Sequence, residues 1–430
     1  MGYYIRYLAV MQTDTIPSST AVEIERRACR AAPSHAAGWS AVFALMLCVG
    51  TLIASEFMPV SLLTPIASDL RLTEGQAGQA IAVSGIFAVL TSLFISSATQ
   101  AIDRRVLLLG LTVVMLVSGL VIASAPNFTV MVVGRALVGV VIGGFWSMSA
   151  AIVMRLVSED EVQRALGLLN GGNALATTIA TPLGSFLGQY IAWRGAFFTI
   201  VPPAALTFLW LFMTLPSMPA RGRSGAAAAF RVLRRRNVPL GIMAVSLLFI
   251  GQFALFTYLR PFLETVTGVS VTALSLILLA LGLSGLLGTY LIGFVVKTRL
   301  YGLLVAMPLA LAAIALALIA VGSSIVATGV LLALWGFIAT AAPVGWWTWL
   351  SRTLPDDAEA GGGLMVAAIQ LAITLGASAG GLMFDSSGYQ ATFAVSTTVL
   401  CGSAVVAFIA SRRAAAAGRS EAWRGTQETA

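Results

Sequence analysis

Two ionisable side chains stand inside otherwise apolar stretches of the sequence and are the first candidates for chemistry. Glu56 lies about six residues before the end of the stretch 40–62, and Arg135 about seven residues after the start of the stretch 129–152. At about 1.5 Å per helical residue, both lie about 10 Å below the same membrane surface. Charges inside apolar spans are costly and usually mark functional sites. We expect Glu56 to bind and release a proton under the influence of Arg135, while a static ion pair between two helices remains the alternative.

Two tryptophans are candidates for binding a flat solute. Arg135, Gly139 and Trp146 lie within about 40° of one another on a helix of 3.6 residues per turn. Trp347 holds the corresponding place in a later stretch, 327–350. A facing pair of indoles would stack on a planar ring, an interaction worth about 1–3 kcal/mol per base. Anchoring of each indole at the membrane interface is the alternative.

Amide side chains at mid-depth form the third group of candidates. They are Asn170, Asn173, Gln252 and Gln370. An amide without a hydrogen-bond partner is unfavourable in an apolar environment, so these side chains are expected to face protein or water. They predict either hydrogen bonds between helices or a polar lining for a hydroxyl-rich or heterocyclic solute.

Enzyme and metal chemistry is not supported by the remaining residues. The only histidine, His35, lies in the polar N-terminal segment, and the three cysteines (Cys29, Cys48 and Cys401) have neither disulfide nor metal-site spacing. The sequence contains no phosphate loop, no glycine-rich nucleotide turn after a strand and no nucleophile with a histidine partner. We therefore expect no enzyme, no cofactor and no bound metal.

The composition places these residues in a membrane. Of the 430 residues, 58% are hydrophobic and 10% charged, against about a quarter charged in soluble domains, and the mean hydropathy is +0.94. A membrane-spanning helix needs about 20 apolar residues. Twelve stretches qualify, and they predict an all-α membrane protein with twelve transmembrane helices: 40–62, 77–97, 106–125, 129–152, 165–189, 195–215, 239–260, 272–296, 300–320, 327–350, 362–383 and 390–411.

Basic residues indicate the orientation. With a cytoplasmic N-terminus, 21 of the 25 Lys and Arg residues fall on the cytoplasmic side, three fall outside, and Arg135 lies within a span. Such a bias places both termini in the cytoplasm. The net charge of +8 therefore reflects membrane topology, and we expect no nucleic-acid partner.

The two halves of the sequence resemble each other, as expected of a duplicated six-helix unit. The spacing of Gly184, Gln189, Trp193 and Phe197 is repeated 196 positions later by Gly380, Asp385, Tyr389 and Phe393, and Gly-Phe-Trp at 144–146 corresponds to Gly-Trp-Trp at 345–347. We expect two pseudo-symmetric halves, with the following boundaries: a disordered cytoplasmic tail (1–38), an N-terminal half (39–215), a basic cytoplasmic linker (216–238), a C-terminal half (239–411) and a cytoplasmic tail (412–430).

Three short motifs resemble those of the major facilitator superfamily. The loop QAIDRR (100–105) is similar to its cytoplasmic signature, RALVG (135–139) to its embedded-arginine motif, and Pro182 with Gly184 to a degenerate antiporter motif. The resemblance implies the major facilitator fold, gating by Asp103, Arg104 and Arg105, and a role of Arg135 in proton transfer, as in the drug:proton antiporter branch.

Longer stretches resemble the bacterial purine ribonucleoside efflux pumps. They include EFMPVSLLTPIASDL (56–70), GGFWSMSAAIVMRLV (143–157), PLGSFLGQYIAWR (182–194), GQFALFTYLRP (251–261) and PVGWWTWLSRTL (343–354). This resemblance covers about residues 39–412. It implies proton-coupled efflux of inosine and guanosine across the bacterial inner membrane.

The leading hypothesis is thus a multi-pass monomer whose partners are the lipid bilayer, protons and a small-molecule substrate. Efflux of a sugar or a hydrophobic drug is the alternative within transport. A nontransporting membrane sensor or scaffold is the alternative from another class, and flux that depends on a solute would separate the two.

Overall fold

The computed structural model describes residues 35–219, 231–235, 237–354 and 358–428. Most of the predicted N-terminal tail and much of the basic linker lie outside these residues. The first described helix begins at His35, three residues before the predicted end of the tail.

The described residues form helices and no strand. In chain order the helices are α3 (His35–Ser61), α4 (Leu63–Leu70), α5 (Glu74–Ala98), α6 (Arg104–Ala123), α7 (Phe128–Leu156), α8 (Val162–Phe198), α9 (Val201–Thr214), α11 (Val238–Phe256), α12 (Leu259–Thr265), α13 (Val271–Val321), α14 (Ile325–Thr353) and α15 (Ala358–Glu428).

Capping side chains explain where several helices begin. Thr73 and Gln76 form a reciprocal capping box at the start of α5, and the carboxylate of Asp103 accepts a hydrogen bond from the first turn of α6. Ser270 and Ser324 cap α13 and α14 in the same way. Each cap satisfies a backbone N–H that has no partner within the helix, so the apolar segments start at defined residues.

Nine helical segments of the described chain are long and apolar enough to cross a membrane. Three of them have 53, 51 and 54 residues (Val162–Thr214, Val271–Val321 and Gly361–Ala414). A single crossing needs about 20 residues, so each of these three crosses twice. With the six single crossings, the described part of the chain has twelve transmembrane helices, as predicted.

The double crossings turn with almost no loop. Helical geometry is interrupted at Ile191 and Ala192 in α8, at Arg299 in α13 and at Gly388 in α15. Gly388 has φ +76°, a conformation that glycine adopts without the steric penalty of a Cβ. The predicted loops between these helix pairs are therefore largely helical, and α15 continues as helix to Glu428 through the predicted C-terminal tail.

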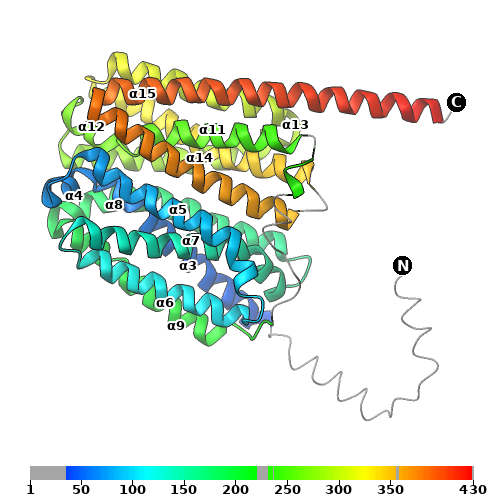
Figure 1. Cartoon of the computed structure of the whole chain (residues 1–430), viewed down its shortest axis with the longest axis horizontal. Helices are drawn as coiled ribbons and strands as arrows, with labels where there is room; N and C mark the ends of the chain where they lie inside the picture. Colours follow the sequence, from blue (N-terminus) through cyan, green and yellow to red (C-terminus); the bar gives the residue numbers. More distant parts are fainter. Residues whose placement is uncertain (1–34, 220–230, 236, 355–357, 429–430) are drawn as a thin grey trace, which may run out of the picture.

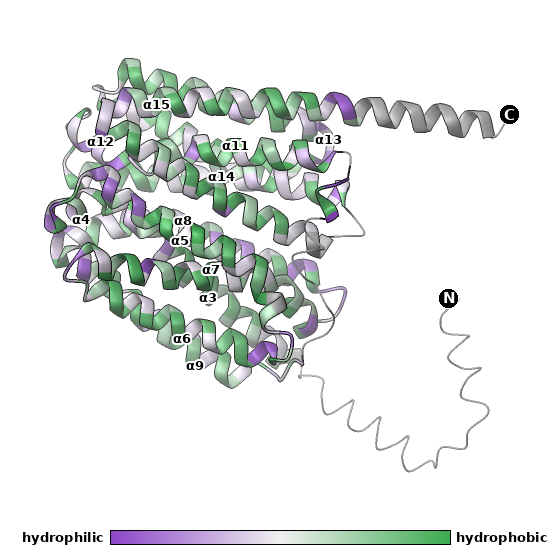
Figure 2. Cartoon of the chain, viewed as in Figure 1, coloured by the Kyte–Doolittle hydropathy of each residue, from purple (hydrophilic) through white to green (hydrophobic). Residues whose placement is uncertain are grey.

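The transmembrane helices are divided between two groups (Figure 1). Buried apolar side chains form two large clusters, one contributed almost entirely by α3–α9 and the other by α11–α15. Hydrophobic residues cover the length of the helices, whereas hydrophilic residues gather mainly near the helix ends (Figure 2). This distribution is the one that a bilayer around the bundle favours.

The two groups meet along two helix pairs, α5 with α15 and α8 with α13. Glycines allow these close approaches. A Cβ on Gly85 would collide with the Thr374 side chain, and one on Gly282 would collide with the backbone at Thr178. Small residues at such contacts are typical of helix packing in membranes.

Candidate transport site

Arg135 is completely buried on α7 and holds three helices together. Its guanidinium donates hydrogen bonds to the backbone carbonyl of Ser55 at 2.7 Å and to that of Glu56 at 3.4 Å on α3. On α5 it donates to the Ala80 carbonyl at 3.3 Å and to the Ser84 hydroxyl at 2.8 Å. All of the guanidinium's described acceptors thus belong to backbone or hydroxyl groups.

A proline explains why a backbone carbonyl of α3 is available to Arg135. Pro59 lies inside α3 and has no N–H, so the carbonyl four residues earlier, that of Ser55, lacks its usual partner within the helix. Arg135 supplies the missing donor at 2.7 Å. The proline of α3 and the embedded arginine therefore form one local structure.

Glu56 is adjacent to Arg135, but its carboxylate faces the other half of the molecule. The side chain is 7% exposed, and its Oε1 accepts a hydrogen bond of 3.2 Å from Nε2 of Gln370 on α15. In the described residues Arg135 bonds to the main chain of Glu56 and forms no ion pair with its carboxylate. The static ion pair weighed from the sequence is therefore absent from this conformation.

Thr374 extends the contact between the halves by one helical turn. Its hydroxyl lies 2.9 Å from the Gln370 carbonyl and 3.2 Å from the Ala82 carbonyl on α5. Glu56, Gln370 and Thr374 are all buried. A change of charge at Glu56 would therefore act directly on the junction between α3, α5 and α15.

Aromatic rings and one unpaired amide oxygen lie beside this junction. The Phe57 ring is 6.0 Å from the Phe253 ring and 6.3 Å from the Phe256 ring, across the two halves. The neighbouring Gln252 has a buried Oε1 without a hydrogen-bond partner among the described residues. An unpaired buried acceptor costs about 1–3 kcal/mol, and a water or a solute with a donor group would satisfy it.

Further bonds between the halves gather at the end of the molecule where α4 and α12 lie, opposite the start of α3 and the end of α15 (Figure 1). The Asp385 carboxylate on α15 accepts hydrogen bonds from the Thr73 hydroxyl at 2.6 Å and from the Gly75 N–H at 3.0 Å. We call these three residues the Asp385 latch. It joins α15 to the N-terminal end of α5.

Two more contacts support this closure. The Ser378 hydroxyl donates to the Gln79 side chain at 3.0 Å. The buried Arg260, which pairs with Glu264 at 2.8 Å, donates to the Ser61 carbonyl across the two halves. The α4–α12 end is therefore closed in this conformation.

The predicted gating residues lie at the opposite end and contact their own half. Asp103 accepts hydrogen bonds from the Ser217 hydroxyl and the Met218 N–H. Although partial burial acts to raise the pKa of Asp103, the bonds from Ser217 and Met218 outweigh it and hold this pKa below its ordinary value. Arg104 donates to the Thr99 hydroxyl at 3.0 Å, and Arg105 donates to the Phe212 carbonyl at 2.7 Å.

The remaining predicted residues are not brought to the Glu56 junction by any described contact. Trp146 packs edge-on against Phe145, whereas Trp347 is 41% exposed on α14, and the described ring contacts do not join the two indoles. Asn170 is exposed and donates to a carbonyl of its own helix, and Asn173 is partly buried. Their roles in substrate binding stay predictions.

Several residues at the Glu56 junction and at the α4–α12 end were not among the candidates derived from the sequence. They are Ser84, Thr374, Asp385 and Arg260. The serine and threonine are too common in membrane helices to stand out. Asp385 and Arg260 lie near predicted helix ends, where charges are ordinary. Only Pro59 could have indicated one of these contacts from the sequence. A proline within a helix predicts a free carbonyl four residues earlier, here that of Ser55.

The comparison with known families decides the identity of this fold. The pattern described as Major Facilitator Superfamily matches residues 45–373, which is well over half of the chain. The chain belongs to the major facilitator superfamily. It is therefore a multi-pass transporter of the bacterial inner membrane and not an enzyme.

Two relatives from this superfamily differ in their names. The chain is 55% identical over 390 residues to a protein of Pseudomonas aeruginosa named "Transcription regulatory protein OpdE", a match covering 90% of this chain and 97% of the relative. It is 42% identical over 362 residues to the "Purine ribonucleoside efflux pump NepI" of Escherichia coli, covering 84% of this chain and 91% of that protein.

Solved structures of other major facilitators share the fold. A D-xylose–proton symporter matches with a TM-score of 0.70 at 17% identity, covering 86% of this chain and 97% of the other. A bacterial homologue of the human lysosomal transporter Spinster, in an inward-facing and unoccupied conformation, matches with a TM-score of 0.66 at 16% identity, covering 87% and 95%. At these identities the likeness concerns the fold alone.

Proposed function

We propose that this transporter exports purine ribonucleosides such as inosine and guanosine in exchange for protons. The observation that carries the proposal is the hydrogen bond between Gln370 and Glu56, because it couples an ionisable group to the contact between the two halves. The 42% identity to a protein named as a purine ribonucleoside efflux pump supports the substrate class.

Proton coupling follows from the strength of that bond. An ionised Glu56 accepts a charge-assisted hydrogen bond from Gln370, and such bonds are about twice as strong as neutral ones. This bond holds the α4–α12 end closed until substrate binds and opens it. Glu56 then takes up a proton from outside, and the neutral carboxyl can be buried again without the cost of burying a charge, so the end closes. Loss of the proton to the cytoplasm restores the charge-assisted bond described here.

Arg135 keeps the carboxylate in place through this cycle. Its bonds to the main chain of Ser55 and Glu56 do not depend on the charge of the Glu56 carboxylate. The guanidinium therefore holds the turn of α3 before Pro59 in both protonation states. Its positive charge also favours the ionised carboxylate once the proton has left.

A nucleoside suits the groups near the junction. Its flat base would pack on aromatic rings, and its N–H and hydroxyl groups would donate to acceptors such as Gln252 Oε1. Trp146, Trp347, Asn170 and Asn173 are proposed to complete the lining. A neutral solute needs no charged partner, in agreement with the small number of charges within the spans.

If both termini are cytoplasmic, as the basic residues predict, the closed α4–α12 end would face outward and this conformation would be inward-facing. Substrate would then enter from the cytoplasm and protons from outside, as efflux by exchange requires. Alternating access arises as the two halves rock about the substrate site.

The test is uptake of radiolabelled inosine into inverted membrane vesicles with an imposed proton gradient. The wild type is expected to accumulate inosine. Glu56→Gln is expected to abolish accumulation while still exchanging labelled for unlabelled inosine, because it removes the titratable group and keeps the shape. Glu159→Gln, at an exposed position outside the spans, is the matched control and should behave as the wild type.

Other results would reject either the coupling residue or the substrate. Accumulation by Glu56→Gln equal to the wild type would reject Glu56 as the coupling residue and keep the substrate. Absence of inosine flux in vesicles that contain folded protein would reject the nucleoside assignment. Sugars and hydrophobic drugs would then be the substrates to test.

A second candidate function rests on the 55% identical relative, whose name describes a transcription regulator. On this hypothesis the fold binds a solute and reports its presence instead of moving it. Transcript levels would be compared in a deletion strain complemented with wild type or Glu56→Gln. If both proteins restore the transcript levels and neither moves solute in vesicles, the sensor is favoured. If only the wild type restores them, the change in transcription is a consequence of transport.

A further inference from the structure

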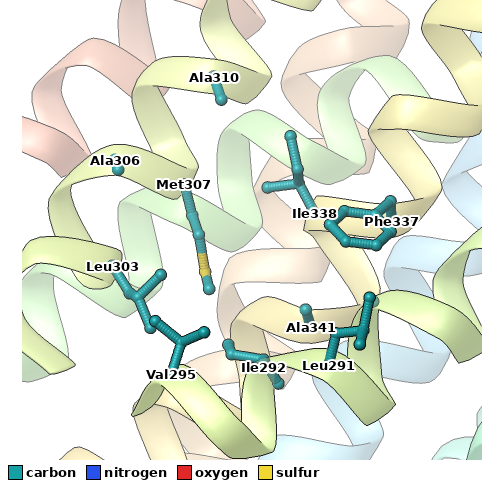
Figure 3. Close-up of a pocket in the computed structure, with 11 residues that line it drawn as sticks. Leu291, Ile292, Val295, Leu303, Ala306, Met307, Ala310, Phe337, Ile338 and Ala341 are labelled. Atoms are coloured by element: carbon teal, nitrogen blue, oxygen red, sulfur yellow. The ribbon is translucent and has the colours of Figure 1, made fainter. Parts of the chain in front are cut away.

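An apolar cavity lies in the wedge between the two limbs of α13 and the neighbouring helix α14 (Figure 3). Its volume is about 250 Å³, and all of its lining residues are apolar or glycine. Leu291 and Val295 contribute from the first limb, Leu303 and Met307 from the second, and Phe337 and Ile338 from α14. The cavity is separate from the Glu56 junction, since none of the residues of that junction lines it.

The position of the lining residues places the cavity within one leaflet of the bilayer. They begin four residues on either side of the bend at Arg299 and end eleven residues from it, at Gly288 and Ala310. At about 1.5 Å per residue the cavity extends from about 6 to 16 Å below the bend. One half of a hydrocarbon core of about 30 Å has the same depth.

The cavity is accessible from the lipid. Leu291 is 41% exposed and Val295 is 42% exposed, and both are lining residues. The adjacent Phe294 is 64% exposed. An occupant would therefore enter sideways from the bilayer and not through the transport path.

Three basic residues lie at the helix ends next to the cavity. Lys297 and Arg299 lie at the bend of α13, and Arg352 lies in the last turn of α14; all three are exposed. The Arg352 guanidinium donates to the Lys297 carbonyl at 3.1 Å, so the end of α14 is held against the bend. Three cations thus lie at the helix ends that close the apolar wedge.

We propose that this wedge binds an anionic phospholipid, with one acyl chain in the cavity and its phosphate at Lys297, Arg299 and Arg352. The apolar lining matches hydrocarbon and excludes a polar solute. The cations match a headgroup with a net negative charge, since basic groups between helix ends are a recognised environment for anionic lipids. Their long side chains reach the headgroup level while their stems stay in the apolar region.

The combination of cavity and charge favours lipid over a second copy of the chain. A second copy would have to cover three positive charges, whereas an anionic lipid neutralises them. Bound lipid would also fill the space between the two limbs of α13 and brace them against α14.

The experiment is native mass spectrometry of the purified full-length protein with phosphatidylglycerol or with phosphatidylcholine. The wild type is expected to retain one phosphatidylglycerol with at least a tenfold preference over phosphatidylcholine. Lys297→Gln combined with Arg299→Gln should remove most of that preference. Ala306→Phe, which fills the wedge from a lining position, should reduce the retention of both lipids.

Matched variants test whether these effects are specific. Arg413→Gln removes an exposed basic residue of α15, and Ala394→Phe adds the same ring at an exposed position of α15; both should retain lipid as the wild type does. Equal retention of the two lipids by the wild type would overturn the charge assignment. Unchanged retention in Ala306→Phe, or an equal loss in Ala394→Phe, would overturn the assignment of the acyl chain to this wedge.

Discussion

At the scale of single residues, the embedded Arg135 bonds mainly to backbone carbonyls and forms no ion pair with the Glu56 carboxylate. Arg135 donates to the main chain of Ser55, Glu56 and Ala80 and to the Ser84 hydroxyl. These acceptors come from two helices and surround a flat guanidinium. A compact ammonium group on a flexible stem cannot reproduce that arrangement.

Arg135→Lys is therefore expected to lower the stability of the fold despite conserving the charge. Each buried acceptor left without a donor costs about 1–3 kcal/mol. Thermal unfolding in detergent should show a clear decrease for Arg135→Lys and none for Arg413→Lys at an exposed position. An unfolding temperature equal to that of the wild type would show that the fourfold hydrogen bonding is dispensable.

The second residue-scale prediction concerns pH at Asp103. Because the pKa of this carboxyl is lowered in the folded protein, its stabilising effect is fully present above the unfolded value of about 3.9. The effect is lost as the pH falls through the lower folded value. Hydrogen exchange at the Met218 amide should thus stay slow from pH 7 to about pH 5 and accelerate only at strongly acidic pH.

Asp103→Asn supplies the comparison. Asparagine keeps one acceptor oxygen but has no charge to titrate, so exchange at Met218 should be faster than in the wild type at neutral pH. The intrinsic pH dependence of amide exchange is removed by reference to an exposed amide. Protection that fades already near neutral pH in the wild type would contradict the lowered pKa.

At the scale of helices, glycines set the distance between the halves. Gly85 on α5 faces Thr374 on α15, and the Thr374 hydroxyl also contacts the Ala82 carbonyl. Any side chain at position 85 must displace Thr374. The closed α4–α12 end therefore depends on a residue without a Cβ.

Gly85→Val is expected to lower the initial rate of transport by about tenfold or more. Overpacking costs about 1–3 kcal/mol, and 1.4 kcal/mol changes an equilibrium tenfold. Gly110→Val is the matched control, because no heavy atom lies within 4 Å of a Cβ built at Gly110 in the transmembrane helix α6. Equal rates in the two variants, at equal amounts of folded protein, would remove the α5–α15 spacing from the mechanism.

At the scale of the whole molecule, the two halves are joined most visibly at one end. The Asp385 latch, the Ser378–Gln79 bond and the Arg260–Ser61 bond all lie there. The predicted gating residues at the opposite end bond within the N-terminal half. This asymmetry is what a transporter closed on one side requires.

Asp385→Asn is expected to shift the molecule toward states open at the α4–α12 end. The ionised carboxylate accepts two hydrogen bonds, and hydrogen bonds to charged groups contribute about 1.5–3 kcal/mol each. Loss of that charge should raise the open population by about tenfold. Labelling of Ala82→Cys by a membrane-impermeant maleimide, in a background without other cysteines, measures this population because Ala82 is 2% exposed in the closed state.

Asp69→Asn controls for the loss of a carboxylate at the same end. Asp69 pairs with Arg194 at 2.6 Å within the N-terminal half, so its loss should leave the labelling rate unchanged. A rate that rises equally in both variants would point to general loosening. A rate that rises in neither would show that the Asp385 latch does not hold the closed state.

Features that depend on a single helix or on composition alone can be predicted from the sequence of this chain. The apolar stretches predicted all twelve crossings, since about 20 apolar residues in a row have no stable alternative to a membrane helix. Glu56 and Arg135 were found for the same reason, because a charge within such a stretch is conspicuous. The gaps between the predicted stretches contain the turns at Arg299 and Gly388, but the hydropathy pattern did not show that helical geometry resumes within one residue of each.

The sequence alone thus determined the class, the number of crossings and the presence of two buried charges at similar depth. Only the tertiary structure decided that Arg135 binds main-chain carbonyls and that Glu56 contacts Gln370, 314 residues away. It also decided that Asp385 closes one end and that an apolar wedge lies next to three cations. Hydropathy is a local property of the chain, whereas hydrogen-bond partners depend on how separate helices are rotated and brought together in space.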